Sequence, residues 1–416
     1  MPISDPTFLS ATPGSAALYE RAVRVMPGGD TRTCVYQPPH ILAMERGSGS
    51  FIWDVDGNRY VDLYYNGLSL LHGHAYGPAT EAIARQLSHG TAWAGSSRAQ
   101  VEFAELLCDR VPSAELVRFC VSGSEAAMLA AKVSRRATGR RLLVRTDTGY
   151  HGSYDGFDEA SGVLVVPDGD ADALERLLDE RGDEIAAVFL EPASVATALA
   201  PPVEFFVRAR EATRAREVVL VFDECITFRN AWGGMQETMG ITPDLTLLAK
   251  FVGGGLPLGV LAGSREIMEH FDPRSPNHIY HSGSFNGYVA ACAAGLVVLR
   301  DYTREAIAEM NRRAERLAGL FQTAAADAGL TMAVDVSGSM IGLQPGVAKA
   351  NQRISSDSLE AYQLLQHAAL VEGLYLQPAE GALGLATSMD DDLVEEVGEH
   401  MHRALVRTRT WLEQGA

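Results

Sequence analysis

The stretch GITPDLTLLAKFVGGGLPLG, residues 240–259, decides how this chain folds. Its apolar run LTLLA has the length and composition of a buried strand, and Lys250 follows that run directly. A glycine-rich turn comes next. Because a charged lysine is costly to bury, we expect a neutral amine there, which is a nucleophile. The alternative is a lysine at a strand end whose ammonium reaches solvent.

Lysine is rare in this sequence. Of 416 residues, 35 are Lys or Arg and 53 are Asp or Glu, which gives a formal net charge of −18 at pH 7. Only three of the basic residues are lysines. Lys132 falls inside a predicted helix and Lys349 in a polar segment, so Lys250 is the best candidate for lysine chemistry. The negative charge repels phosphate backbones and anionic lipid, and we therefore expect no nucleic-acid and no membrane partner.

Further apolar runs lie upstream of Lys250, separated by helical patterns. They have few interior polar residues, which is typical of strands buried on both faces of a mostly parallel sheet. Strands that alternate with helices predict an α/β fold, in which ligands bind at the carboxyl ends of the strands. The runs are LVRFCV (116–121), RLLVRT (141–146), GVLVVP (162–167), IAAVFLEP (185–192) and VVLVFDE (218–224).

The length of the chain is too great for one ordinary core of roughly 100–200 residues, so we expect several lobes. Residues 1–70 read as an N-terminal segment with a helix and a β-hairpin around an Asp-Val-Asp-Gly-Asn turn. Residues 71–300 form the predicted large α/β domain. Residues 301–416 combine long helices with short strands, which predicts a smaller α+β C-terminal domain.

Cysteine usage and the N-terminus indicate the compartment. Five cysteines without a C-x-x-C pair favour neither a disulfide framework nor a structural zinc site, and we predict no metal. The N-terminus lacks the basic and apolar regions of a secretory signal. The longest apolar run, 288–299, is shorter than the roughly 20 residues that span a bilayer. We expect a cytoplasmic protein.

Polar residues follow several of the predicted strands. Gly123 and Ser124 open a helix whose free N–H groups suit an anion, although Ser122 before them is also an ordinary helix cap. Asp223 can face a cation in a dry site, or make a salt bridge to a helix. Tyr150 supplies an aromatic plane, and the HSGSFN segment containing Ser284 is a second possible phosphate contact.

Together these residues offer an anion site, a ring-stacking aromatic, a carboxylate for a ring nitrogen and an amine. That set matches pyridoxal phosphate, whose aldehyde needs a lysine and whose pyridinium needs an acid. A nicotinamide site is the competing interpretation, but no G-x-G-x-x-G follows the first strand of a βαβ unit, and no P-loop pattern is present.

The motif order resembles that of the class III pyridoxal-phosphate aminotransferases over nearly the whole chain. The matching motifs are residues 240–259, VVLVFDE, SGSEAAM (122–128), PGGDTR (27–32), WDVDGNRYVD (53–62) and GH (73–74). Within that family the chain looks most like glutamate-1-semialdehyde aminomutase and the β-amino-acid aminotransferases. The resemblance implies fold type I, with a mostly parallel seven-stranded sheet between helices.

The resemblance also implies roles for individual residues. Lys250 would form the Schiff base with the cofactor and move the substrate proton, and Asp223 would pair with the pyridine nitrogen. A homodimer is implied, because one subunit's Ser284 would reach the phosphate of its neighbour. The remaining positions are Gly123 and Ser124 at the phosphate, Tyr150 stacked on the ring, and Arg32 at a substrate carboxylate. Glu191, a nearby carboxylate, and Glu380 are the other residues that we predict to bind substrate.

The chain departs from the family pattern at three places, of which the second alters the subunit boundary and the third matters most for the substrate. Cys225 replaces the valine that packs under the ring, and we favour packing over catalysis for it. Residues 287–289 lack the usual Gly-Asn-Pro. Residues 374–388 carry neither the arginine of the β-amino-acid enzymes nor, in register, the glutamate of the aminomutase, Glu380 being displaced. This favours a neutral or cationic acceptor such as an amino sugar, whereas Arg32 suits a carboxylate donor.

We therefore predict an aminotransferase that moves an amino group from an amino-acid donor to a carbonyl of a specialised metabolite. An oxidised amino sugar is favoured as the acceptor over a β-keto acid. An aminomutase or epimerase on the same scaffold is the main alternative. A non-enzymatic binding module and a nicotinamide dehydrogenase are the others.

Overall fold

The computed structural model describes residues 6–349, 356–377 and 382–414, and Glu380 lies outside them. The chain divides into two compact units. The first contains the chain up to Tyr76, Ala196–Leu199 and the chain from Glu309 onward, and the second contains Gly77–Val195 and Ala200–Ala308. None of the helices in the described ranges is long and apolar enough to cross a membrane.

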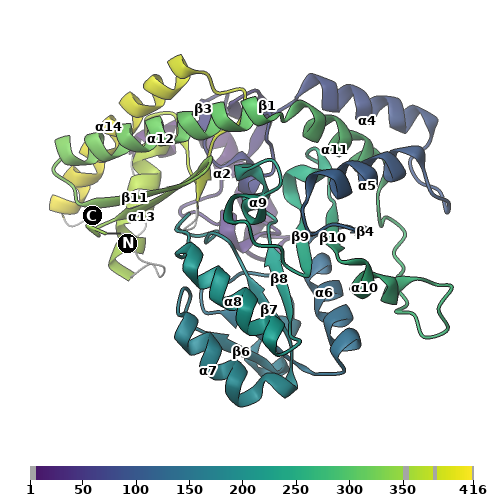
Figure 1. Cartoon of the computed structure of the whole chain (residues 1–416). Coiled ribbons are helices and arrows are strands. Elements are labelled where there is room, and N and C mark those ends of the chain that lie inside the picture. Colours follow the sequence, from purple (N-terminus) through teal and green to yellow (C-terminus); the bar gives the residue numbers. More distant parts are fainter. Residues whose placement is uncertain (1–5, 350–355, 378–381, 415–416) are drawn as a thin grey trace. The chain divides into compact units, whose positions relative to one another are not determined.

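The second unit is built on a seven-stranded sheet in the order β4-β10-β9-β8-β7-β5-β6 (Figure 1). Strand β10 runs antiparallel to both of its neighbours, and the remaining pairs are parallel. This confirms the predicted α/β fold of type I. The strands are β4 (Leu116–Cys120), β5 (Leu142–Thr146), β6 (Val163–Val166), β7 (Ile185–Leu190), β8 (Val219–Asp223), β9 (Leu245–Leu248) and β10 (Gly259–Gly263).

Helices cover both faces of this sheet, which explains the continuous apolar runs in its strands. Alternate strand residues such as Phe189 and Val221 pack with helix α6, whereas Val188 and Leu220 pack with α7 and α8 on the other face. The helices of this unit are α4 (Gly77–His89), α5 (Arg98–Arg110), α6 (Gly123–Thr138), α7 (Ala171–Arg181), α8 (Val203–Ala215), α9 (Met235–Met239), α10 (Arg265–Met268) and α11 (Val289–Asp301).

Helix α11 lies directly against the glycine-rich turn that follows Lys250. A Cβ added to Gly295 would overlap the carbonyl oxygen of Val252, and one added to Gly254 would lie 2.5 Å from Cβ of Ala294. Gly254 also has a φ of +61°, which favours glycine. The backbones of α11 and of the turn therefore lie so close together that both need small residues at the contact.

The first unit contains two small sheets, of order β1-β2-β3-β13 and β11-β12-β14. Its strands are β1 (Met44–Ser48), β2 (Phe51–Asp54), β3 (Arg59–Asp62), β11 (Met332–Ser337), β12 (Met340–Pro345), β13 (Leu374–Tyr375) and β14 (Leu383–Gly384). Its helices are α1 (Pro6–Ala11), α2 (Pro13–Ala22), the short turn α3 (Tyr65–Leu68), α12 (Arg304–Asp327, from residue 309), α13 (Ser356–Val371) and α14 (Asp391–Glu413).

The three predicted parts, 1–70, 71–300 and 301–416, differ from the two compact units of the structure. The N-terminal hairpin and the C-terminal segment share a sheet, because β13 pairs in parallel with β3 through Leu374 opposite Val61. The N-terminal range and the C-terminal range from Glu309 onward belong to one unit, whereas residues 301–308 belong to the other.

Substitution Gly295→Ala tests the contact between α11 and the turn. The added methyl group would collide with backbone, so we expect the free energy of unfolding to fall by about 1–3 kcal/mol. Gly319→Ala in α12 is the control, because nothing lies within 4 Å of the added Cβ and loss of glycine freedom is neutral or stabilising there. Equal melting temperatures for the two variants would contradict the close contact.

Candidate active site

Lys250 lies just past the carboxyl end of β9, where the chain turns into the short helix Lys250–Gly253. Its φ is +59°, a left-handed conformation that costs a residue with a side chain about 1–3 kcal/mol. Such strain persists only where the surroundings hold it. Here the strand before Lys250 and the glycine turn packed on α11 fix the direction in which the backbone leaves the sheet.

Asp223 is the last residue of the neighbouring strand β8, opposite Leu247 of β9. Its carboxyl is buried, with Oδ2 2.9 Å from Nδ1 of His151 and Oδ1 accepting the Cys225 N–H at 3.1 Å. Burial opposes ionisation, but the His151 and Cys225 interactions outweigh it and hold the pKa of Asp223 below its ordinary value. A buried carboxylate thus stands on the strand beside Lys250.

His151 is a residue to which the sequence analysis assigned no role. Its ring is fully buried, with centroids 5.1 Å from Phe157 and 5.6 Å from Phe189. Its Nε2 has no hydrogen-bond partner within the described ranges. The signal that could have revealed it is its position, directly after Tyr150 and close to the end of an apolar strand.

The first turn of α6 contains Gly123 and Ser124, the residues predicted to bind an anion. Ser122 caps the helix by accepting the Glu125 N–H at 3.2 Å, while the first N–H groups of the helix have no acceptor within it. The loop after β5 lies on this turn: Gly152, at φ +105°, is so close that an added Cβ would sit 2.5 Å from Oγ of Ser124. The Ser153 N–H donates to the same Oγ at 3.3 Å.

Cys225 and Gly123 are in contact, since a Cβ on Gly123 would lie 3.0 Å from the sulfur. Burial and the nearby Asp223 charge raise the pKa of the Cys225 thiol well above its ordinary value, although Lys250 opposes the shift. The side chain is therefore a neutral thiol, which agrees with a packing role.

Glu191 and Tyr150 are joined by a hydrogen bond from the Tyr150 N–H to Oε2 of Glu191, 3.1 Å long. Burial and the Asp223 charge raise the pKa of Glu191 well above its ordinary value, and Lys250 acts in the opposite direction. Glu191 thus lies among the same charged groups. The Tyr150 side chain is 52% exposed, and its hydroxyl lies 2.8 Å from Oγ of Ser153.

Ser284 is exposed on a segment that a histidine fixes in place. Arg118 Nε donates to Nδ1 of His281 at 2.8 Å, and the other ring nitrogen lies 3.1 Å from Oε1 of Glu125. Glu125 belongs to the first turn of α6, so this network ties the segment of Ser284 to the anion site of its own chain.

Arg32 belongs to the first compact unit. Its guanidinium donates to Oη of Tyr64 at 2.9 Å and to Oδ1 of Asn66 at 2.5 Å. Neither partner was predicted from sequence. Glu380, the other predicted substrate residue, lies outside the described residues.

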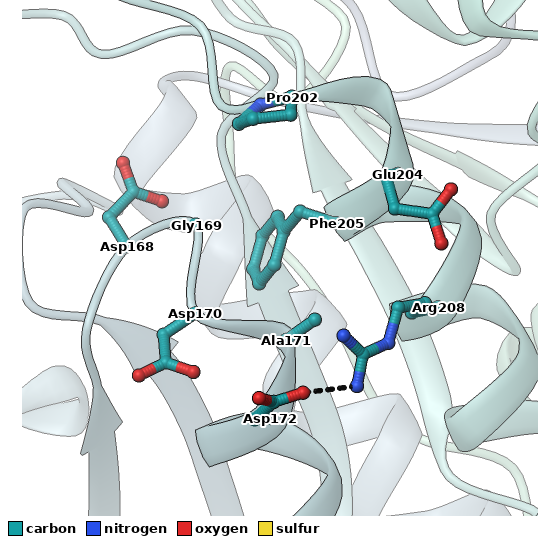
Figure 2. Close-up of a pocket in the computed structure, with 9 residues that line it drawn as sticks. All are labelled: Asp168, Gly169, Asp170, Ala171, Asp172, Pro202, Glu204, Phe205 and Arg208. Atoms are coloured by element: carbon teal, nitrogen blue, oxygen red, sulfur yellow. Dashed lines mark hydrogen bonds and ion pairs between the residues drawn. The ribbon is translucent and has the colours of Figure 1, made fainter.

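A separate pocket of about 440 Å³ lies at the N-termini of α7 and α8 (Figure 2). Two of its lining residues form an ion pair, in which Nη2 of Arg208 lies 2.5 Å from Oδ1 of Asp172. Its lining contains none of the predicted site residues, and consists of Asp168, Gly169, Asp170, Ala171, Asp172, Pro202, Glu204, Phe205 and Arg208.

The residues gathered at the carboxyl edge of the large sheet fit pyridoxal phosphate. An amine at Lys250 suits the aldehyde, a buried carboxylate at Asp223 suits a protonated ring nitrogen, and the N-terminus of α6 suits the phosphate. The donor set therefore agrees with the cofactor that the sequence predicts.

Comparison with known proteins gives the family. Residues 34–157 and 167–405 match the family model described as aminotransferase class-III. The chain is 34% identical to a glutamate-1-semialdehyde 2,1-aminomutase of Bacillus licheniformis, covering 94% of this chain and 97% of the relative.

Two solved structures are similar throughout. An omega-transaminase from Sphaerobacter thermophilus has a TM-score of 0.91 and 34% identity, covering 96% of this chain and 99% of that one. A beta-phenylalanine aminotransferase from Variovorax paradoxus has a TM-score of 0.89 and 29% identity, covering 98% and 96%.

The fold is that of a pyridoxal-phosphate enzyme of fold type I. The chain belongs to the class III aminotransferase family, which contains both aminotransferases and aminomutases. The predicted family, enzyme class and cofactor are thereby confirmed.

Substitution His151→Phe tests the support of Asp223. Phenylalanine keeps the ring between Phe157 and Phe189 but removes the hydrogen bond, so we expect kcat/KM to fall roughly 10- to 100-fold. The pKa of Asp223 is held down by His151. Without that partner the carboxylate protonates at higher pH, and the acid limb of the pH profile moves upward.

The measurement is kcat/KM against pH, with His89→Phe at the exposed end of α4 as the control for the same substitution. A His151→Phe profile that overlays the parent profile would show that Asp223 does not depend on this histidine.

Proposed function

We propose that the protein is an aminotransferase that takes an amino group from a carboxylate-bearing donor and passes it to the carbonyl of a small metabolite. The observation that supports the donor class is the environment of Arg32. Among the described residues the side-chain partners of its guanidinium are neutral, namely a phenol, an amide and, more weakly, the Cys34 thiol at 3.8 Å, whereas the Asp30 carboxylate accepts only the backbone N–H of Arg32. A guanidinium held by neutral groups keeps its full charge for an anionic ligand.

Pyridoxal phosphate, when bound, supplies an aldehyde that takes up the amino group and a protonated ring that draws electrons from the substrate carbon. We assign Lys250 the covalent link to the cofactor and the transfer of the proton at the substrate carbon. Asp223, kept ionised by His151, holds the proton on the ring nitrogen. Gly123 and Ser124 bind the phosphate through the first turn of α6, and Tyr150 covers the ring.

The assignment of the remaining residues follows from their surroundings. Cys225 packs as a neutral thiol beside Gly123. Glu191 fixes the backbone of Tyr150, so we assign it to support of the ring-stacking loop in addition to the substrate contact predicted from sequence. Glu380 stays a predicted substrate residue.

For the acceptor, the oxidised amino sugar stays a prediction, ahead of a β-keto acid. It rests on the formal charge of −18 and on the sequence of 374–388, which lacks the arginine of the β-amino-acid enzymes.

We propose a homodimer in which Ser284 of one subunit contacts the phosphate bound by the other. The support is that Ser284 lies on a segment that exposes large side chains, with Tyr280 76% and Phe285 57% exposed. Surfaces of that kind are typical of protein interfaces.

A second candidate is an aminomutase, which exchanges amino and carbonyl groups within one substrate. The support is the 34% identity to an enzyme of that name. The two functions differ in whether nitrogen crosses between molecules.

An isotope experiment separates them. The enzyme with its cofactor is given a ¹⁵N-labelled amino acid and a panel of acceptors that includes an oxidised amino sugar, a β-keto acid and glutamate-1-semialdehyde. An aminotransferase delivers ¹⁵N to the acceptor. Isomerised product that forms without a donor and carries no label would replace the proposal by the aminomutase.

Substitution Lys250→Ala tests the lysine assignment. We expect the visible absorption band of the bound cofactor to disappear and turnover to fall at least 10⁴-fold or so, since no other residue supplies the amine. Lys132→Ala is the matched control, because that lysine only donates to the Tyr280 carbonyl at 3.1 Å on the surface. A band that survives in Lys250→Ala and disappears in Lys132→Ala would reverse the assignment.

A further inference from the structure

The short turn α3 has a left-handed backbone at four consecutive residues. The φ angles are 45° at Tyr65, 53° at Asn66, 72° at Gly67 and 61° at Leu68. Only one of the four is a glycine, and each of the others has a cost in this conformation. A run of this kind requires a surrounding structure that holds it.

Asp62 holds the turn from its buried position at the end of β3. Its Oδ1 accepts the N–H groups of Tyr64 and Tyr65, both at 2.8 Å, and its Oδ2 lies 2.7 Å from Nε2 of His74. His74 is fixed in turn by backbone hydrogen bonds with Gly49, 2.8 and 2.9 Å long. The motifs WDVDGNRYVD and GH, which the cofactor chemistry does not use, together build this support.

The turn presents a side chain to Arg32 in one orientation. Asn66 donates from Nδ2 to Oγ of Ser69 at 3.3 Å, which leaves Oδ1 to accept from Nη1 of Arg32 at 2.5 Å. The amide orientation is thus set by both neighbours.

Tyr64, which directly precedes the turn, holds the second nitrogen of the guanidinium. Its Oη accepts from Nη2 of Arg32 at 2.9 Å. Burial raises the pKa of Tyr64 to about 12 although Arg32 opposes the shift, so the phenol is neutral at ordinary pH. Counting the weaker Cys34 contact, three of the five N–H donors of the guanidinium therefore meet neutral acceptors, and the charge is not cancelled.

We infer that Asn66 and Tyr64 are positioning residues that set the preference of the enzyme for carboxylate-bearing donors. Their hydrogen bonds hold the Arg32 guanidinium in one orientation before the donor binds, and they leave its charge unneutralised. The left-handed turn places the Asn66 amide within hydrogen-bond distance of Arg32. An unfixed arginine would lose side-chain freedom on binding and would bind the carboxylate more weakly. The inference rests on the proposed function, since it takes Arg32 as the group that binds the carboxylate.

The experiment compares a carboxylate donor with an amine of the same shape that lacks the carboxylate. β-Phenylalanine and 1-phenylethylamine are such a pair, and single turnovers of the cofactor-loaded enzyme give a rate even for a slow donor. The measured quantity is the ratio of the two second-order rate constants. A merely structural defect lowers both constants together and leaves the ratio unchanged.

Asn66→Gly is the central variant, because glycine accepts the left-handed backbone and only the amide is lost. We expect the ratio to fall roughly five- to tenfold, through a higher half-saturating concentration of β-phenylalanine, and Tyr64→Phe to act in the same direction. Asn66→Asp should lower the ratio further, since its carboxylate would neutralise Arg32. Arg46→Ala is the control, an arginine that stacks on Trp53 at 3.6 Å in the same unit.

Arg32→Ala tests the carboxylate assignment of Arg32 separately from the positioning role of Asn66 and Tyr64. If it leaves the ratio unchanged, Arg32 does not bind the carboxylate, and that part of the proposed function fails. If Arg32→Ala abolishes the preference while Asn66→Gly and Tyr64→Phe keep the parent ratio, the donor assignment stands and the positioning inference is overturned.

Discussion

The buried carboxylate of Asp223 needs hydrogen-bond partners, and this need determines much of the site in the large α/β unit. Asp223 ends a strand that is buried on both faces, and an uncompensated carboxylate there would cost several kcal/mol. The ring of His151 and the Cys225 amide provide the compensation. Because His151 must reach Asp223, the loop after β5 has to lie over the end of β8.

That loop position has consequences for its neighbours. Gly152 packs directly against Ser124, and the Tyr150 N–H donates a hydrogen bond to Glu191. The same few residues thus bring Tyr150 and the first turn of α6 to the edge of the sheet where Asp223 ends. Gly152 is required because the loop passes the first turn of α6 too closely for any Cβ.

The sequence predicted those features that depend on local pattern. Continuous apolar runs gave the buried strands, and the residues that follow them gave Lys250 and Asp223. His151 was missed because its partner lies 72 positions away, and Tyr64 and Asn66 were missed for the same reason, 32 and 34 positions from Arg32. The two-residue strand β13 is too short to show any period, so its pairing with β3 could not be foreseen.

Lys250 and Arg32 show why a lysine is needed at one position of the proposed site and an arginine at another. The role that we propose for Lys250 is to form and release a covalent bond, which only an amine that can lose its proton allows. The role that we propose for Arg32 is to keep its charge for a carboxylate while neutral groups fix its direction, which a guanidinium does because it stays protonated. The surroundings match: a strained strand end beside a buried carboxylate for the amine, a phenol and an amide for the guanidinium.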